Sequence, residues 1–244
     1  MGKLDGKVAL VTGASEGMGL ESARLFAAEG ATVYITGRRQ DALDAAVTAS
    51  GDVLTGIQAD SGRPEDLDRV FEQIASQSGK IDVVFASAGG GDMQEPIEAV
   101  TPESFQRVFA VNTLGSLLTV QKALPLLRYG GSIILNGAAN IGKGLPGAGV
   151  YAASKAANRS LVRTWAAELR GRNIRVNIIS PGAVHTPAAE LLPEPVREFI
   201  VGQVPLGRFG EPAELAAAAL FLASDDSSFI TGAELAVDGG LAQV

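Results

Sequence analysis

The chain has 244 residues, of which 46% are hydrophobic and 19% charged, so it can bury a sizeable core. Acidic residues outnumber basic ones by 27 to 20, there is no Cys, and His185 is the one histidine, which disfavours a nucleic-acid surface, disulfides and a Cys- or His-based metal site. We expect small-molecule partners, no nucleic acid, no membrane and no metal, and a cytoplasmic location because the first residues hold no long apolar run.

Seven short apolar, β-branched segments predict strands, and several of them lack apolar–polar alternation, as strands covered on both faces do. Their residues are 8–12, 32–36, 53–57, 81–86, 132–136, 174–179 and 233–237. The intervening segments are long enough for crossover helices, and Leu20, Ala23 and Ala27 would form an apolar stripe on a first helix over 17–29. The pattern predicts an α/β fold with a doubly wound, mostly parallel sheet in a single domain, 1–244.

One segment late in the chain departs from this alternation of strands and helices. In residues 187–210 several prolines interrupt a helical pattern. We interpret the segment as a substrate loop or lid, with a plain surface insertion as the alternative. Together with residues 88–98, AGGGDMQEPIE, it would shape a pocket whose geometry the sequence does not define.

A glycine-rich turn follows the first predicted strand directly. Residues 12–19 read TGASEGMG, with Gly13, Gly17 and Gly19 leading into the first helix. Glycine lets the backbone approach a ligand closely, and free N–H groups at a helix start favour a pyrophosphate. The alternative is a tight strand-to-helix turn with no ligand, but the strand–turn–helix context favours a dinucleotide.

The end of the second predicted strand bears on the choice of dinucleotide. Where an acidic residue would accept the ribose hydroxyls, this chain has Gly37, followed by Arg38 and Arg39. Guanidinium groups suit a 2′-phosphate, so we expect NADP(H) in preference to NAD(H), which remains possible. A solvated basic pair is the plain alternative, and Glu16 in the glycine turn could repel the same phosphate.

Tyr151 and Lys155 lie four residues apart, on one face of a predicted helix. A nearby ammonium favours the phenolate form of tyrosine, and about 4 kcal/mol of such stabilisation would bring the phenol into a useful range for proton exchange with an alcohol or ketone oxygen. Without the glycine turn, an unremarkable pair on a surface helix would be the better interpretation.

Four motifs in this order resemble the short-chain dehydrogenase/reductase family in its single-domain form. They are TGASEGMG (12–19), YAASK (151–155), SPGAVHTP (180–187) and the closing segment FLASDDSSFITGAELAVDGG (221–240). The resemblance spans nearly the whole chain. It implies a Rossmann-type sheet, a nicotinamide cofactor, a carbonyl or alcohol substrate, hydride transfer and a homotetramer.

The resemblance also implies roles for individual residues. Tyr151 would be the acid–base residue, Lys155 would hold the ribose and lower the phenol pKa, Asn112 would hold a water for proton relay, and Asp60 would contact adenine. The family's NNAG motif appears here as Ala86-Ser87-Ala88-Gly89. The full set of expected cofactor-binding residues is Gly13, Ser15, Gly17, Met18, Gly19, Gly37, Arg38, Arg39, Asp60, Ser87, Ala88, Gly89, Tyr151, Lys155, Pro181, Gly182, Val184 and Thr186.

The largest departure from the family lies thirteen residues before Tyr151. The family has there a serine that hydrogen-bonds the substrate oxygen, whereas this chain has Ala138. We expect Asn140 to supply an N–H in its place, with Asn136 as the alternative and a loop-stabilising turn as the structural role of either. The expected function is an NADP(H)-dependent reductase or dehydrogenase; the alternative is an NADP(H)-binding protein with little or no catalysis.

Overall fold

The computed structural model describes residues 2–91 and 95–244, so part of the predicted pocket segment 88–98 lies outside the described residues. One sheet has the strand order β3-β2-β1-β4-β5-β6-β7, and every pairing between neighbours is parallel. Its strands are β1 (Val8–Val11), β2 (Thr32–Gly37), β3 (Leu54–Gln58), β4 (Ile81–Ala86), β5 (Leu127–Asn136), β6 (Arg175–Pro181) and β7 (Glu234–Val237).

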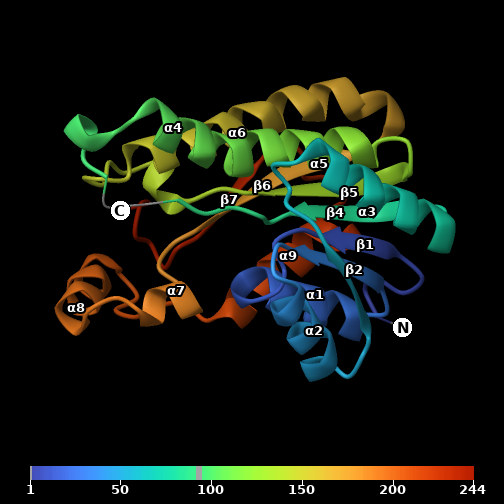
Figure 1. Cartoon of the computed structure of the whole chain (residues 1–244), viewed down its shortest axis with the longest axis horizontal. Helices are drawn as coiled ribbons and strands as arrows, with labels where there is room; N and C mark the ends of the chain where they lie inside the picture. The colour runs from blue at the N-terminus through green and yellow to red at the C-terminus, as the bar shows by residue number, and fades with distance from the viewer. Residues whose placement is uncertain (1, 92–94) are drawn as a thin grey trace.

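Helices cover both faces of the sheet, with α1, α2 and α9 on one side and α3 to α6 on the other, while α7 and α8 project beyond the layers (Figure 1). The helices are α1 (Gly17–Ala28), α2 (Gln40–Ala49), α3 (Pro64–Gln77), α4 (Pro102–Phe109), α5 (Gly115–Ala123), α6 (Gly149–Glu168), α7 (Pro187–Glu190), α8 (Glu194–Gln203) and α9 (Pro212–Ala223). Short turns of 3-10 helix are η1 (Ile97–Ala99), η3 (Ala139–Ile141), η4 (Leu169–Arg172) and η5 (Asp225–Ser227), and η2 (Ala110–Leu114) is a π-helical turn between α4 and α5. The predicted doubly wound α/β sheet is confirmed.

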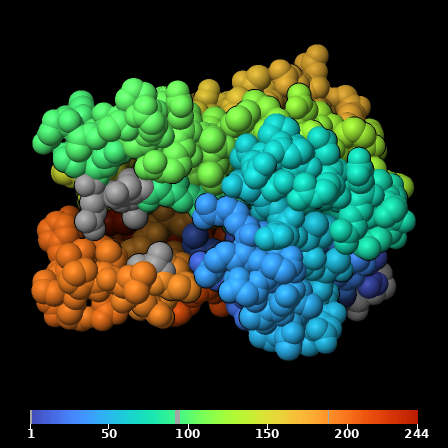
Figure 2. Space-filling model, viewed as in Figure 1, coloured from blue at the N-terminus to red at the C-terminus, as the bar shows by residue number. Residues whose placement is uncertain are grey.

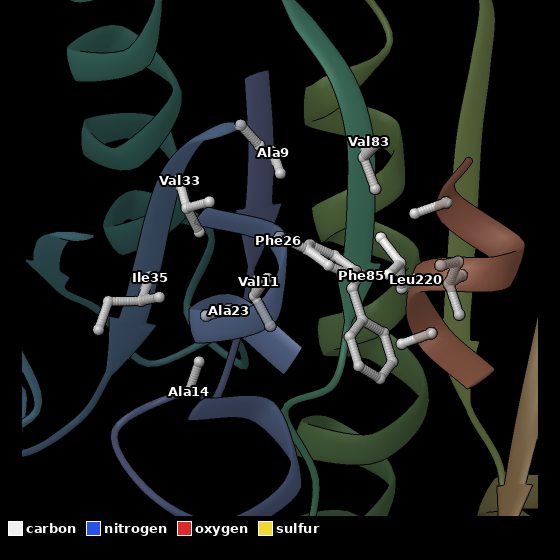
Figure 3. Packing of buried hydrophobic residues seen from close by; sticks show 14 of the residues in the cluster. Ala9, Val11, Ala14, Ala23, Phe26, Val33, Ile35, Val83, Phe85 and Leu220 are labelled. Atoms are coloured by element: carbon white, nitrogen blue, oxygen red, sulfur yellow. The ribbon is translucent and has the colours of Figure 1, made fainter. Parts of the chain in front are cut away.

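The strands are buried on both faces because alternate residues enter different layers. In β1, Ala9 and Val11 join the apolar cluster under α1 and α9, whereas Val8 and Leu10 join the cluster under α3, α5 and α6. Figure 3 shows Phe26 of α1 in the first cluster, close to Phe85 of β4. This two-sided burial explains why the strand sequences lack alternation.

One predicted strand begins too late. β5 starts at Leu127, five residues before the predicted start at Ser132. Leu127 pairs with Ile81, and the register then shifts before Ser132 pairs with Val83. The irregular stretch contains Gly130, whose φ is +79°. A glycine at this place suggests a turn in the sequence, whereas in the structure the strand continues on both sides of the irregularity.

The central strands β1 and β4 are neighbours, although two βα units separate them in the chain. The chain winds from β1 toward β3 on one side and from β4 toward β7 on the other. At such a switch point the loops after the strands diverge and leave a crevice at the carboxyl edge of the sheet. Among the residues that the structure describes, no helix has the length and apolar character needed to cross a membrane.

Candidate active site

The glycine turn lies at this switch point and packs tightly against the loop after β4. Gly13 has a φ of +63°, and a Cβ on it would lie 2.6 Å from the Cα of Ala88. The amide of Ala88 in turn donates to Thr12 Oγ1 at 3.1 Å. Glycine is therefore required at position 13 both by the backbone conformation and by the close approach of the two loops.

The start of α1 is suited to an anion. Glu16 occupies the N-cap position without a side-chain hydrogen bond to the helix, and the first turn contains no acidic residue. Gly17 has a φ of +59°, and Thr186, from the segment after β6, lies opposite it, 3.6 Å from the position of a Cβ. Uncapped N–H groups beside an open backbone fit the pyrophosphate of a dinucleotide.

The side chains of two expected cofactor-binding residues pack mainly against the apolar core. Met18 packs against the apolar cluster beneath α1, and Val184 is buried in the same cluster. A Cβ on Gly19 would lie 2.8 Å from the carbonyl oxygen of Gly13, so this glycine permits α1 to pack on the turn. Val184 and Gly19 would therefore meet a nucleotide mainly through their backbones.

The end of β2 contacts the glycine turn. A Cβ on Gly37 would lie 3.1 Å from Ser15 Oγ, so a larger residue here would displace the turn. Arg39 forms an ion pair of 3.0 Å with Glu16, while Arg38 lines a cavity of about 340 Å³ together with Asp60. The sequence predicts that both arginines lie beside a phosphate. In the structure, Arg39 instead forms an ion pair with Glu16.

Tyr151 and Lys155 both lie in the N-terminal part of α6, where Lys155 is buried and Tyr151 is partly exposed. Lys155 Nζ donates to the backbone carbonyl of Asn136 at 3.0 Å and lies 5.8 Å from the centre of the Tyr151 ring. A Cβ on Gly89 would lie 2.7 Å from Lys155 Nζ and 2.8 Å from Asn112 Oδ1. The loop after β4 thus comes close to the pair because residue 89 has no side chain.

Burial dominates the protonation of this pair. It raises the pKa of Tyr151 to about 12 and lowers the pKa of Lys155 from 10.5 to about 8. In the chain without a bound nucleotide, burial therefore outweighs any effect of Lys155 on the phenol pKa, and the predicted role of Lys155 in lowering that pKa stays a prediction. Desolvation disfavours the phenolate, and the Lys155 ammonium donates to Asn136 O instead of the phenol.

Asn112 lies fully buried in the π-helical turn η2, beside the same loop. Its Oδ1 accepts from Gly90 N at 2.8 Å, and its Nδ2 donates to Gly90 O and Ser154 Oγ, both at 2.9 Å. Its backbone carbonyl accepts from Ser116 Oγ at 2.7 Å and from Asn158 Nδ2 at 2.9 Å. Asn112 therefore ties the loop after β4 to α6.

Sequence reasoning missed Asn158, which is also fully buried and lies on the Tyr151–Lys155 side of α6. Its position, three residues after Lys155, places a further polar side chain on the buried face of α6, which also holds Ser154 and Val162. Its Oδ1 is buried without a partner among the described residues. A polar residue in that register was the one signal that could have revealed it.

The position of the family serine is occupied by Ala138, which is buried at the start of η3, and η3 packs against α6. The Nδ2 of Asn136 donates to the carbonyl of Ser87 at 3.3 Å, which ties β5 to the loop after β4. By contrast, Asn140 Oδ1 is buried with no hydrogen-bond partner in the described part of the chain. Asn140 is thus the candidate asparagine whose side-chain oxygen, an acceptor, is buried without a partner among the described residues.

The segment after β6 forms the other wall of the crevice. A Cβ on Gly182 would lie 2.6 Å from the Cα of Asp238, so the segment that begins at Pro181 packs directly on the chain after β7. Thr186 caps α7 by accepting from Ala189 N at 3.3 Å. Figure 2 shows a hollow between α7–α8 and the part of the chain that carries α4. The predicted loop 187–210 thus borders this hollow with two helices.

Within residues 2–91 and 95–244, no group of three or more His, Cys, Asp or Glu side chains is arranged to hold a metal ion. His185 lies against Phe209, with ring centres 5.1 Å apart, and its Nε2 is 3.8 Å from Glu211 Oε1. A parallel sheet with a glycine turn after β1 and a Tyr-x-x-x-Lys pair at the switch point is the arrangement of a nicotinamide-dependent oxidoreductase.

Comparison with known proteins agrees with this class. The family model described as Enoyl-(Acyl carrier protein) reductase matches residues 13–242. Oxidoreductase asL5 of Sarocladium schorii is 45% identical over 99% of this chain and 98% of its own length, and the 3-oxoacyl-[acyl-carrier-protein] reductase FabG of Thermotoga maritima is 39% identical over 98% and 99%. Tetrahydroxynaphthalene reductase of Pyricularia oryzae is 33% identical over 97% and 90%.

Solved structures show the same relationship. A double mutant of a short-chain dehydrogenase/reductase from Serratia marcescens superposes with a TM-score of 0.93 at 32% identity, and covers 98% of this chain and 99% of its own. The chain belongs to the short-chain dehydrogenase/reductase family, as its motifs predicted, and is an oxidoreductase of the classical, single-sheet type.

Proposed function

We propose that this protein is an NADP(H)-dependent carbonyl reductase that can also oxidise the corresponding alcohol. The observation that carries the proposal is the pair of Tyr151, partly buried, and Lys155, fully buried, held at the switch point beside Gly89. The uncapped start of α1 would hold the pyrophosphate, and Arg38 and Asp60 would bind the adenosine end in the cavity that they line. When bound, the nicotinamide supplies the hydride that reaches the carbonyl carbon.

Residues of the chain supply the proton for the carbonyl oxygen and orient the cofactor and the substrate. Tyr151, whose raised pKa keeps its phenol protonated near neutral pH, donates a proton to the carbonyl oxygen as the alcohol forms. Lys155, held by Asn136 O, orients the ribose, and Asn112 holds the loop that lines the nicotinamide side. The Nδ2 group of Asn140 donates to the substrate oxygen in place of a hydroxyl at Ala138.

The names of relatives suggest two substrate classes. One relative is a reductase of 3-oxoacyl groups on acyl carrier protein, and another reduces a tetrahydroxynaphthalene. A substrate panel for this chain should therefore contain a 3-oxoacyl thioester, a polyhydroxylated aromatic ketone and simple aliphatic and aryl ketones.

We also expect a single domain, a homotetramer and a cytoplasmic location. Light scattering after size exclusion would measure the oligomeric state.

Steady-state oxidation of NADPH against this panel tests the proposal with the native chain and Tyr151→Phe. Tyr151→Phe should lose at least about a hundredfold in kcat/KM while its affinity for NADPH changes little. Equal activity of the two proteins would overturn the mechanism.

The second candidate is an NADP(H)-binding protein with little or no catalysis. It is favoured by Ala138, since a missing oxyanion donor typically costs about a hundredfold or more in rate. Tight binding of NADPH without turnover of any panel member, and without rescue by Ala138→Ser, would support it.

A further inference from the structure

A group of buried polar side chains joins the turn η2 and the start of α5 to helix α6. Asn112 and Ser116 lie four residues apart along η2 and α5, and Ser154 and Asn158 lie four residues apart on α6. Each of the four is at most 3% exposed. Asn112 Nδ2 donates to Ser154 Oγ at 2.9 Å, and Asn158 Nδ2 donates to Ser116 Oγ at 3.3 Å. Because a buried polar group needs hydrogen bonds to offset its desolvation, these contacts fix how the two segments face one another.

The backbone carbonyl oxygen of Asn112 is held from both elements. Ser116 Oγ donates to it at 2.7 Å and Asn158 Nδ2 at 2.9 Å. A carbonyl oxygen has two lone pairs, so both acceptor positions are used, and a water at this carbonyl would have to displace one of the two donors. A π-helical turn interrupts the regular hydrogen bonding of a helix. The two side chains therefore fix the backbone where the helix is irregular.

The position of Asn112 affects the catalytic pair through the loop after β4. Asn112 Oδ1 accepts from Gly90 N at 2.8 Å, and its Nδ2 donates to Gly90 O at 2.9 Å. At the preceding residue, a Cβ on Gly89 would lie 2.7 Å from Lys155 Nζ, so the loop and the lysine are in close contact. A shift of η2 would move the loop relative to Lys155, because two hydrogen bonds tie the loop to Asn112.

Packing alone does not favour an asparagine at position 158. Asn158 Oδ1 is buried without a hydrogen-bond partner among the described residues, and such an unpaired group lowers stability. Val162, one turn further along the same buried face of α6, belongs to the apolar cluster under α3, α5 and α6. A leucine at 158 would have the same branched heavy-atom skeleton without an unpaired polar atom. The N–H groups that Asn158 donates are what distinguishes it from such a leucine.

We propose that Asn158 is a positioning residue for carbonyl reduction. Together with Ser116, it fixes the Asn112 carbonyl and takes a position that a water would otherwise occupy. The loop at Gly90 is thereby held against Lys155. The proposal rests on the proposed function, because it assumes that this site reduces a carbonyl group. Asn158 acts through Asn112 and the loop, not by contact with the substrate.

Steady-state kinetics with NADPH and the panel member that the native chain reduces fastest test this role. Asn158→Leu removes the N–H donor and should lower kcat about tenfold, with an NADPH affinity within about twofold and a melting temperature within about 3 °C of native. Val162→Ala is the matched control on the same helix face: it removes packing and no hydrogen bond, so the melting temperature should fall while kcat stays native. Native kcat in Asn158→Leu would overturn the proposal, as would an equal fall of kcat in the two variants.

Ser116→Ala, which removes a single oxygen atom, tests the same carbonyl from α5 and decides the question if Asn158→Leu does not fold. It should lower kcat about threefold and leave the NADPH affinity native. The double variant should lose more than the product of the two single losses, because no side-chain donor then remains on the carbonyl. A double loss equal to that product or smaller would overturn the shared role, and so would native kcat in Ser116→Ala.

The native chain separates this inference from the proposed function. If the native chain reduces no panel member, the proposed function is overturned and this inference with it. If it does, and Asn158→Leu loses kcat, NADPH affinity and melting temperature together, Asn158 has a structural role alone and only the positioning role is overturned. Fluorescence titration of NADPH and circular dichroism melts supply these two readouts.

Discussion

Lys155 Nζ and the backbone carbonyl oxygen of Asn136 lie 3.0 Å apart in a hydrogen bond that is buried between α6 and the end of β5. No other hydrogen bond from this amine is found within the described residues, so a single carbonyl compensates a fully buried ammonium. That cost is visible in the pKa of Lys155, which burial lowers to about 8. Such an unfavourable position is typical of a group kept for function.

Lys155→Met should reduce kcat/KM for carbonyl reduction about a hundredfold and leave the protein equally stable or more stable at pH 7.

The stability of the native protein should also depend on pH through Lys155. Between about pH 8 and pH 10.5 the unfolded chain holds the Lys155 proton and the folded chain does not, so the native protein gains stability as the pH rises. Urea unfolding at several pH values checks this: the Met variant should lack that rise. A less stable variant at pH 7 would contradict a functional reason for the buried lysine.

The pH dependence of the two directions should differ. Because the pKa of Tyr151 is about 12, its phenol stays protonated and can donate to a carbonyl oxygen. Reduction should keep a constant kcat/KM below about pH 8 and decline above it as Lys155 loses its proton, whereas alcohol oxidation should rise with pH. Initial rates in both directions from pH 6 to 10 measure this. A reduction rate that rises with pH would contradict the assignment.

Ala138→Ser should raise kcat/KM about a hundredfold, because it restores an O–H donor at the end of β5, facing the helix that carries Tyr151. Ala139→Ser is the matched control, since it adds the same hydroxyl to the next buried residue. Equal kinetics of the native chain and the Ala138→Ser variant would mean that the substrate oxygen lies elsewhere.

Asn140→Ala should lower kcat/KM about tenfold without loss of stability, because Asn140 Oδ1 has no partner to lose among the described residues. Asn136→Ala should instead lower the free energy of unfolding by about 1 kcal/mol, since it removes the hydrogen bond to Ser87 O. Kinetics and thermal melts of both variants distinguish the two roles. A stability loss confined to Asn140→Ala would reverse the assignment.

Gly89→Ala should abolish most activity, because its Cβ would lie 2.7 Å from Lys155 Nζ and force the lysine or the loop to move. Gly149→Ala, at the start of α6, is the control: its Cβ would meet nothing within 4 Å. We expect Gly149→Ala to retain native kinetics and stability. Native activity in Gly89→Ala would show that the lysine position is not needed.

The strands, the crossover helices and the glycine turn were predictable from the sequence because each depends on local pattern. A strand buried on both faces needs an unbroken apolar run such as VALV, and the approach of Gly13 to Ala88 permits only glycine. The early start of β5 was not predictable, since Gly130 interrupts the pattern while tertiary pairing with β4 continues the strand.

What the sequence determined by itself is the order of the motifs and hence the family, because the spacing of Tyr151 and Lys155 follows directly from helix geometry. Only the tertiary structure determines how burial shifts the pKa of the site residues and which charged side chains form ion pairs. Burial, not the neighbouring ammonium, sets the pKa of Tyr151, and Glu16 engages Arg39 across two helix starts. Desolvation and pairing arise between segments distant in the chain, so they exist only once the chain has folded.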